Sequence, residues 1–262
     1  MRKIPLSEMK AVRSLGQKKF RDALGLFVVE GEKMVEEALR SGLEVTAVYR
    51  IDEVGRETMA RMSMLKNPSP ALAVVRKPSR EDVPAPERGL FLALDSIRDP
   101  GNMGTILRTA DWFGIDTIFA SGDSVEVYNP KAVQASMGAV FRVRVHYCDL
   151  GAVCAGVLKA GGRIYGTLLD GENIYKVDLD SGEEHPVLVV TGNESEGISE
   201  GVRGCITDAL LIPRTREGSE SLNAAVATAI TLAEFRRGED VTEKMGIRRP
   251  ERDIKRDYDE RP

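Results

Sequence analysis

The chain has 262 residues, of which 42% are hydrophobic and 30% are charged, and its formal net charge is −4. This composition predicts a soluble globular protein that can bury a hydrophobic core. No apolar run approaches the roughly 18 residues that a membrane-spanning helix needs, and the basic N-terminus lacks the apolar segment of a secretory signal. We therefore expect a cytoplasmic protein.

Cysteine and histidine are scarce. The three cysteines are Cys148, Cys154 and Cys205, and the two histidines are His146 and His185. The odd cysteine count and the wide spacing argue against a disulfide framework or a paired-cysteine metal site. We expect these five residues to have packing or surface roles, and we predict no bound metal.

The first 21 residues carry seven basic side chains and one acidic side chain. Such a cluster can neutralise RNA phosphates. The alternative is a solvated helix face. We single out Lys18, Lys19 and Arg21 as candidate RNA-binding residues.

The next segments alternate between strand and helix patterns. Short apolar runs predict strands at 26–31, 45–50 and 71–76, and an amphipathic pattern that ends in glycine predicts a helix at 32–42. Three prolines and six charged residues in 77–88 indicate a linker. We therefore predict a small α/β domain at 1–78, a linker at 79–88 and a second domain at 89–240.

The second domain repeats this alternation more strongly. Apolar runs predict strands at 89–96, 116–121, 141–147, 163–169, 186–193 and 208–214, and helical patterns cover 105–114, 150–162 and 221–237. This order predicts an α/β fold with a mostly parallel sheet that binds its ligands at the carboxyl ends of the strands. Dense mixed charge near the end predicts a flexible tail at 241–262.

The stretch "DPGNMGTILRTADWFG" at 99–114 follows the first of these strands. It matches neither the dinucleotide-binding fingerprint nor the P-loop. Gly101 and Gly104 flank Asn102, and glycines allow a ligand to approach the backbone closely. Arg108 follows Gly104 by about one helical turn and could bind a phosphate or carboxylate. The alternative is an ordinary loop with a surface arginine.

Two further polar loops follow strands. "GNESEGIS" at 192–199 places Asn193 and Glu194 at a strand end, and "IPRTREGSESLNAAVA" at 212–227 carries Ser221 and Asn223 near a helix start. Ser221 could also act as a helix N-cap alone. Each loop is weak evidence by itself, whereas three loops that each follow a strand and each carry an asparagine form a stronger signal.

Together these segments resemble the SpoU (TrmH) family of RNA ribose 2′-O-methyltransferases, within the SPOUT class. "DSIRDPGNMGTILRTADWFG", "VTGNESEGIS" and "IPRTREGSESLNAAVATAI" match the three motifs of that family in order and spacing. The N-terminal part resembles the L30e-like RNA substrate-binding domain of many members. The resemblance implies a parallel-sheet SPOUT domain with a C-terminal trefoil knot, and a homodimer whose active site is completed across the interface.

The implied reaction is methyl transfer from S-adenosylmethionine to a ribose 2′-hydroxyl, with ribosomal RNA as the favoured substrate. By resemblance, Arg108 is the central catalytic residue, either as general base or as an electrostatic clamp; a permanently protonated guanidinium favours the clamp. The remaining catalytic candidates are Asn102, Glu194, Ser221 and Asn223. The family pattern places the cofactor at Thr167, Leu168, Gly192, Asn193, Ile212 and Leu222, mainly on backbone groups.

Three alternatives remain open at the level of sequence. The substrate could be transfer RNA, or the chain could be a non-catalytic RNA-binding or ribosome-assembly factor on the same fold. The presence of all five catalytic candidates argues against the second alternative. A nucleotide-dependent oxidoreductase is disfavoured because the dinucleotide fingerprint is absent.

Overall fold

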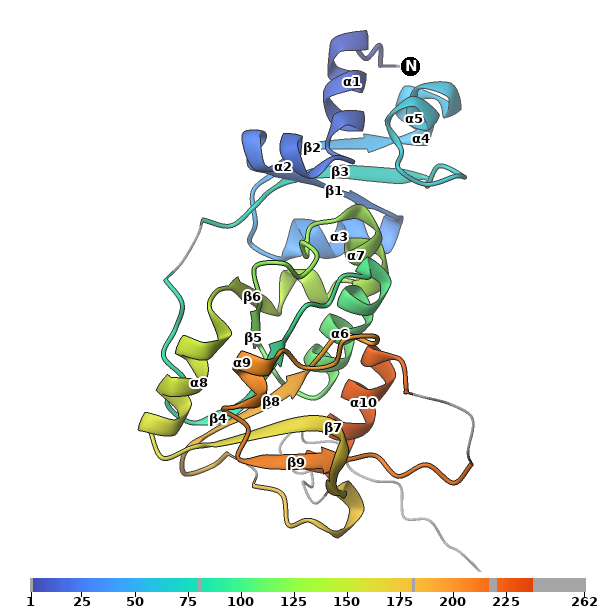
Figure 1. Cartoon of the computed structure of the whole chain (residues 1–262). Helices are drawn as coiled ribbons and strands as arrows, with labels where there is room; N and C mark the ends of the chain where they lie inside the picture. Colours follow the sequence, from blue (N-terminus) through green and yellow to red (C-terminus); the bar gives the residue numbers. More distant parts are fainter. Residues whose placement is uncertain (1, 80–81, 181, 217–220, 238–262) are drawn as a thin grey trace, which may run out of the picture.

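The computed structural model describes residues 2–79, 82–180, 182–216 and 221–237. Two β-sheets, one in each part of the chain, form the framework (Figure 1). The predicted tail at 241–262 and residues 80–81 of the predicted linker lie outside the described residues.

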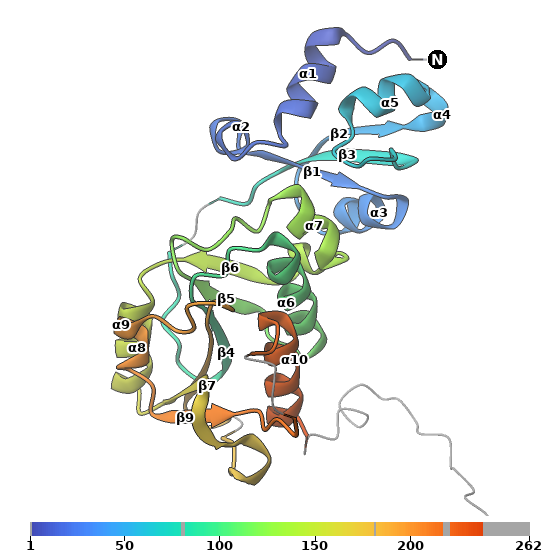
Figure 2. The same cartoon turned by 45° about the vertical axis from the view of Figure 1, so that its right-hand side comes forward.

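The N-terminal part contains a three-stranded antiparallel sheet in the order β1-β3-β2. Its elements in chain order are α1 (Leu6–Ser14), α2 (Lys18–Leu24), β1 (Leu26–Glu30), α3 (Glu32–Arg40), β2 (Val45–Arg50), α4 (Ile51–Val54), α5 (Arg56–Met62) and β3 (Ala71–Arg76). Helix α3 covers one face of this sheet, while α1 and α5 lie on the other side (Figure 2). The side chains of β1 alternate between these two faces: Phe27 and Val29 pack toward α3, and Val28 packs toward α1 and α5.

The C-terminal part contains a six-stranded sheet in the order β6-β5-β4-β8-β7-β9, and every neighbouring pair is parallel. Its strands are β4 (Gly89–Leu94), β5 (Thr117–Ala120), β6 (Arg144–Tyr147), β7 (Arg163–Asn173), β8 (Pro186–Thr191) and β9 (Asp208–Leu211). Its α-helices are α6 (Pro100–Trp112), α7 (Pro130–Ser136), α8 (Leu150–Lys159), α9 (Glu200–Arg203) and α10 (Ala224–Phe235), with short 3₁₀ turns at Ala139–Phe141 and Ile174–Lys176. The predicted α/β fold with a parallel sheet is confirmed, whereas the trefoil knot stays a prediction from the family resemblance.

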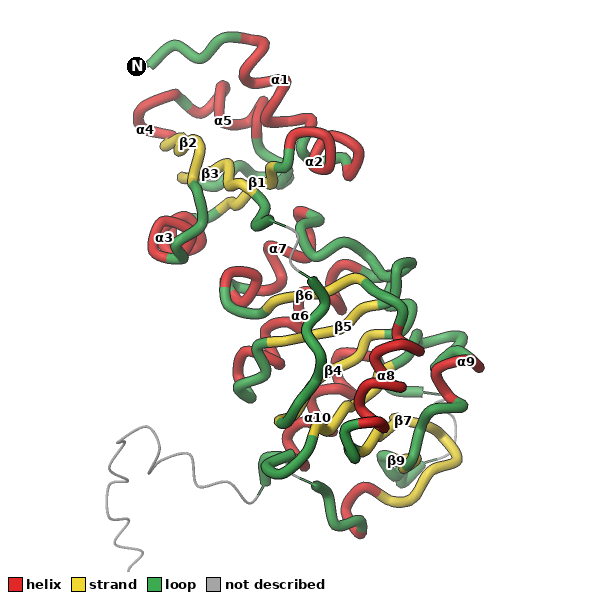
Figure 3. Tube along the Cα trace, turned by 90° about the vertical axis from the view of Figure 1, so that its left-hand side faces the viewer, coloured by secondary structure: helices red, strands yellow, loops and turns green. Residues whose placement is uncertain are grey.

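Helices cover both faces of the six-stranded sheet. Helices α6 and α10 lie side by side on one face (Figures 1 and 2), and α8 lies on the other, in front of the sheet in Figure 3. Strand β8 is buried along its whole length, with Val187 and Val189 facing one core and Leu188 and Val190 facing the other. Burial on both faces explains why this strand is continuously apolar.

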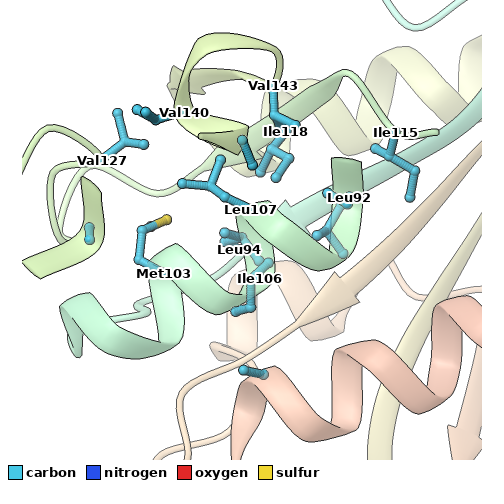
Figure 4. Close-up of a cluster of buried hydrophobic side chains, with 14 of the residues drawn as sticks. Leu92, Leu94, Met103, Ile106, Leu107, Ile115, Ile118, Val127, Val140 and Val143 are labelled. Atoms are coloured by element: carbon cyan, nitrogen blue, oxygen red, sulfur yellow. The ribbon is translucent and has the colours of Figure 1, made fainter. Parts of the chain in front are cut away.

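Buried side chains of α6 hold this helix on the sheet (Figure 4). Met103, Ile106 and Leu107 pack beside Leu92 and Leu94 of β4, and all five have no exposed surface. Helix α6 of the first motif is therefore fixed by apolar contacts, and its polar first turn stays available for contacts with the loops.

Two predicted helix starts were placed wrongly. Helix α6 begins at Pro100 and not at residue 105, because the carboxylate of Asp99 caps it and proline suits the first helical position. Helix α10 begins at Ala224, and its N-cap is Asn223 rather than Ser221. Gly101, Asn102 and Gly104 therefore belong to a helix and do not form a loop.

Charged contacts join the two parts of the chain. The guanidinium of Arg21 lies 2.7 Å from the carboxylate of Glu126, and Arg142 lies 2.7 Å from Glu37. The rings of Phe27 and Tyr128 stack with centroids 4.7 Å apart. Arg21 is only 2% exposed and also donates to the backbone carbonyl of Leu15. The Arg21 guanidinium thus joins the two parts of the chain, and the expectation that it binds RNA stays a prediction.

Candidate functional site

Three loops meet at one edge of the six-stranded sheet. Strands β4, β8, β7 and β9 are consecutive neighbours and parallel, so the segments that follow them emerge at the same carboxyl edge. The first segment leads into α6, the second is 192–199, and the third leads from β9 to α10. The three sequence motifs thus converge, although they are separated along the chain.

Asn102 occupies the first turn of α6, where the backbone is set by the cap. Its backbone N–H donates to Asp99 Oδ1 at 2.8 Å, which leaves the side-chain amide available for other contacts. Gly104 does not form a ligand cradle, because a Cβ there would lie 2.4 Å from the carbonyl oxygen of Ala132 in α7. The glycine instead allows α6 and α7 to pack closely, and this fixes the position of Asn102.

A hydrogen-bonded cluster links the three motifs. The Asn102 amide donates to the carboxylate of Glu194, and the amide of Asn223 donates to Asn102 Oδ1 at 2.9 Å. The Ser221 hydroxyl lies 3.5 Å from the backbone carbonyl of Glu194, at the long limit for a hydrogen bond. We refer to Asn102, Glu194 and Asn223 as the amide–carboxylate cluster.

The second loop is held in shape by Asn193. Its side-chain amide donates to the backbone carbonyl of Ser96 at 2.9 Å, and its side-chain oxygen accepts from the N–H of Ser195. Its own backbone N–H and carbonyl both bond to Gly197. A Cβ at Gly192 would lie 2.4 Å from the Gly197 carbonyl carbon, so this loop closes tightly on itself. Asn193 therefore shapes the loop, and its N–H is not free for the expected cofactor contact.

Arg108 stands apart from the amide–carboxylate cluster. It is exposed, and it forms no hydrogen bond or ion pair with another described residue. At 100° per residue it lies on a different side of α6 from Asn102, and it shares an exposed face with Thr105 and Trp112. The structure thus brings together four of the five catalytic candidates and leaves the fifth on a neighbouring surface.

The expected cofactor residues Thr167 and Leu168 lie within β7, and Ile212 lies just after β9. The ladder between these strands shifts register between Thr167 and Glu172, so the backbone of Leu168 and Leu169 lies outside it. Ile212 follows the last residue of β9 and is half-buried. Leu222 precedes the cap of α10 and is 46% exposed. These segments offer backbone polar groups next to apolar side chains, as a neutral aromatic ligand requires.

The sequence analysis missed Arg98, which lies at the edge of the same loops. Its guanidinium contacts both carboxylate oxygens of Glu196 at 3.2 Å, and it lies 3.6 Å from Asp123. Hydrogen bonds from Ser121 and Ser96 lower the pKa of Asp123, while Arg98 adds a smaller effect in the same direction. Arg98 thus joins the first loop to the second. This role could not be predicted, because the sequence around Arg98 does not show that Glu196 lies beside it.

Lys18 and Lys19 are exposed on α2, as a role in RNA binding requires. Lys18 pairs with Asp22 at 2.6 Å, and Lys19 lies over the ring of Phe20. Across the described ranges, no three or more histidine, cysteine, aspartate or glutamate side chains form a group that could hold a metal, and no helix could span a membrane.

Comparison with known proteins identifies both parts of the chain. Residues 89–233 match the model of the SpoU rRNA methylase family, and residues 7–77 match that of the MRM3-like substrate-binding domain. The Bacillus subtilis 23S rRNA (guanosine(2553)-2′-O)-methyltransferase RlmP is 28% identical, with 87% of this chain and 96% of that protein covered. The Streptomyces viridochromogenes 23S rRNA (uridine(2479)-2′-O)-methyltransferase is 30% identical, with 82% and 84% covered.

The fold is also found in solved structures. An S-adenosylmethionine-bound rRNA methyltransferase from Sinorhizobium meliloti superposes with a TM-score of 0.80 at 28% identity, over 90% of this chain and 97% of that one. The matched family model includes the amide–carboxylate cluster and all three loops. On the match to more than half of its length, this chain belongs to the SpoU rRNA methylase family.

Proposed function

We propose that this protein transfers a methyl group from S-adenosylmethionine to a ribose 2′-hydroxyl in ribosomal RNA. The observation that carries the proposal is the amide–carboxylate cluster, in which one side chain from each of the three family motifs joins a single hydrogen-bonded unit. The relatives named as 23S rRNA 2′-O-methyltransferases share most of their length with this chain, and they favour ribosomal over transfer RNA.

The cofactor site would lie on Thr167, Leu168, Gly192, Ile212 and Leu222. The register shift after Thr167 supports this assignment, because it leaves backbone groups of Leu168 outside the ladder. The apolar side chains of Leu168, Ile212 and Leu222 would contact the adenine and the aliphatic chain. When bound, S-adenosylmethionine supplies a methyl group that is already activated by a positively charged sulfur.

The chain's own residues would orient the ribose and stabilise charge. Asn102 and Asn223 present amide groups that can both donate and accept, and Glu194 fixes the orientation of Asn102. Arg108 would bind the RNA phosphate and stabilise the negative charge that forms on the 2′-oxygen as its proton passes to water. The 2′-oxygen bonds to the methyl carbon while the carbon–sulfur bond breaks, which leaves S-adenosylhomocysteine. We assign Arg108 the electrostatic role because a guanidinium stays protonated.

We also propose a homodimer that covers the face of α6 carrying Arg108. Trp112 on this face is 84% exposed, and Val226 on the adjacent α10 is 47% exposed. A tryptophan so exposed on a helix is typical of an interaction surface. A second copy packed on this surface would exclude water around Arg108 and thereby strengthen its electrostatic effect.

The two parts of the chain would divide the work. We propose that residues 1–78 recognise RNA, that 79–88 link the parts, and that 89–240 carry out the transfer.

The test is transfer of labelled methyl groups to unmodified ribosomal and transfer RNA transcripts, followed by mapping of the modified nucleotide. We expect label at a ribose 2′-oxygen of ribosomal RNA. Label in transfer RNA alone would reassign the substrate. Cofactor binding without label in any RNA would identify a non-catalytic RNA-binding factor.

A further inference from the structure

An open cavity of about 800 Å³ lies between the two parts of the chain. One wall comes from α1 and the turn after it, together with Arg61 and Met64 at the end of α5. The opposite wall comes from the C-terminal part, through Pro100 at the start of α6 and the segment Asn129–Lys131. The cavity thus belongs to neither part alone, and its size lies within the range of small-molecule binding sites.

The lining of this cavity is positively charged. It includes Lys10, Arg13, Arg61 and Lys131, and no acidic residue. Arg61 pairs with Glu57 at 2.7 Å. Lys10, Arg13 and Lys131 form no ion pair with any residue that the structure describes.

Some exposed cations of the protein form ion pairs, whereas Arg108, Lys33 and Lys159 form none with a described residue, so what sets the three cavity cations apart is that they face one cavity. Lys18 pairs with Asp22, Arg142 pairs with Asp111 and Glu37, and Arg203 pairs with Asp170. Three cations without carboxylate partners, contributed by both parts and facing one cavity, point to an anionic ligand that both parts share.

Apart from these cations, the lining on both walls is mostly apolar. Met9 and Met64 contribute flexible, polarisable side chains, and Pro100 and Pro130 contribute flat rings. Such surfaces accept the face of a heterocyclic base without a sequence-specific pattern of hydrogen bonds. An apolar wall beside unpaired cations matches a nucleotide, which has a flat base next to a phosphate.

The cavity reaches the start of α6, the helix that carries Asn102 of the amide–carboxylate cluster. Pro100 lines the cavity as the first residue of α6, and Asn102 of the cluster follows two residues later. Consecutive Cα atoms are about 3.8 Å apart, so the two residues lie within about 8 Å of each other. A ligand in the cavity would therefore lie at the same end of α6 as Asn102.

We infer that this cavity binds an unpaired nucleotide of the RNA substrate that flanks the methylated one. Its base would pack against Met9, Met64 and Pro100, and Arg13 and Lys131 would hold the adjoining phosphates from opposite walls. The inference rests on the proposed function for the identity of the ligand. It adds that the substrate is unpaired beside its target, because the bases of an A-form duplex are stacked and cannot present a face to such a cavity.

The experiment compares the wild-type chain with the double variant Arg13→Gln/Lys131→Gln. The matched control is Lys33→Gln/Lys159→Gln, which removes two exposed cations that do not line the cavity. Binding of a fluorescein-labelled oligouridylate and of a fully paired RNA duplex is followed by anisotropy over a salt series. All four altered positions are exposed, so thermal unfolding should match the wild type in both variants.

We expect the double variant to bind the single strand on the order of tenfold more weakly at low salt. The slope of log affinity against log salt should fall by about 1.4, since each phosphate contact on a single strand contributes about 0.7. In the control variant, the loss of affinity and the fall in slope should each be less than about a third of those in the double variant. With thiouridine in the oligouridylate, photocrosslinks should map to peptides that contain Met9 or Met64.

Equal losses in the two variants, or crosslinks confined to other peptides, would overturn the inference. Preference of the wild type for the duplex would also overturn it. Calorimetry with S-adenosylmethionine runs in parallel on all three proteins. Absence of cofactor binding in the wild type would count against the proposed function and leave the RNA result interpretable by itself.

Discussion

The side chain of Asn223 contacts Asn102 and caps its own helix at the same time. Its amide nitrogen donates to Asn102 Oδ1 at 2.9 Å, while its oxygen accepts from the N–H of Ala225 at 3.0 Å and of Val226 at 3.3 Å. The cap fixes the orientation of the side chain, so the amide nitrogen must point toward α6. The two roles use different atoms, and substitution can therefore separate them.

Asn223→Asp should preserve the cap and abolish the contact with Asn102. Aspartate is as good an N-cap as asparagine, so the loss in unfolding free energy should be limited to about 1 kcal/mol for the lost hydrogen bond to Asn102. Methyl transfer should fall by at least about tenfold, because an oriented donor is lost. Asn223→Ala should lose about 1 kcal/mol of stability as well. Urea unfolding and labelled methyl transfer measure the two effects; full activity in the aspartate variant would show that the contact has no role.

Asn102→Asp should place a second carboxylate against Glu194. The two like charges repel, and we expect a loss of about 1–2 kcal/mol in unfolding free energy near neutral pH. Adding Glu194→Gln should restore most of it, because the glutamine amide can donate to the new aspartate and Asn223 can still donate to it. Urea unfolding of both variants provides the measurement. A double variant no more stable than the single one would mean that Asn102 and Glu194 do not interact.

Gly104→Ala should destabilise the protein by forcing α6 away from α7. The added methyl would lie 2.4 Å from the backbone oxygen of Ala132 and 2.6 Å from Ala135 Cβ, and neither can move without shifting α7. We expect a loss of about 2 kcal/mol. Gly201→Ala in α9 is the control, since no atom lies within 4 Å of its added methyl. Similar urea midpoints for the two variants would contradict the close approach of the helices.

Glu126→Ala should weaken the junction between the two parts of the chain. It would leave Arg21, which is 2% exposed, without its carboxylate partner, and removing one member of a buried pair costs about 3 kcal/mol. Glu36→Ala removes the exposed partner of Arg40 and should cost less than about 1 kcal/mol. Urea unfolding of both variants measures the two losses of unfolding free energy. Equal losses would show that the pair of Arg21 and Glu126 does not stabilise the junction.

Much of the fold could be predicted from the sequence, because a buried parallel strand leaves a continuous apolar run. Strand β8 of the parallel sheet gave such a run, and so did β3, which is buried as the central strand of the antiparallel sheet. Helix α7 was missed, because seven residues are too short for an amphipathic pattern to stand out. The start of α6 was missed because the glycines around Asn102 were interpreted as a loop, although Asp99 and Pro100 form a helix cap.

The site was predictable only in part. Asn102, Glu194 and Asn223 stood out as polar residues at strand ends, and their mutual contacts follow from the parallel sheet. The burial of Arg21 could not be predicted, because its partner Glu126 is 105 positions away in the chain and belongs to the other part of the molecule. The cavity around Arg13 and Lys131 could not be predicted either, because its two walls come from distant parts of the chain.

Labelled methyl transfer by Arg108→Ala tests the central claim most directly. Arg108 is exposed and forms no hydrogen bond or ion pair with another described residue, so the substitution should leave stability and S-adenosylmethionine binding unchanged. We predict that turnover on ribosomal RNA falls by at least about a hundredfold, as expected when a group that stabilises transition-state charge is removed, and that Arg108→Lys recovers only part of it. Turnover within a few-fold of the wild type would contradict the assignment of Arg108 as the residue that stabilises the charge on the 2′-oxygen.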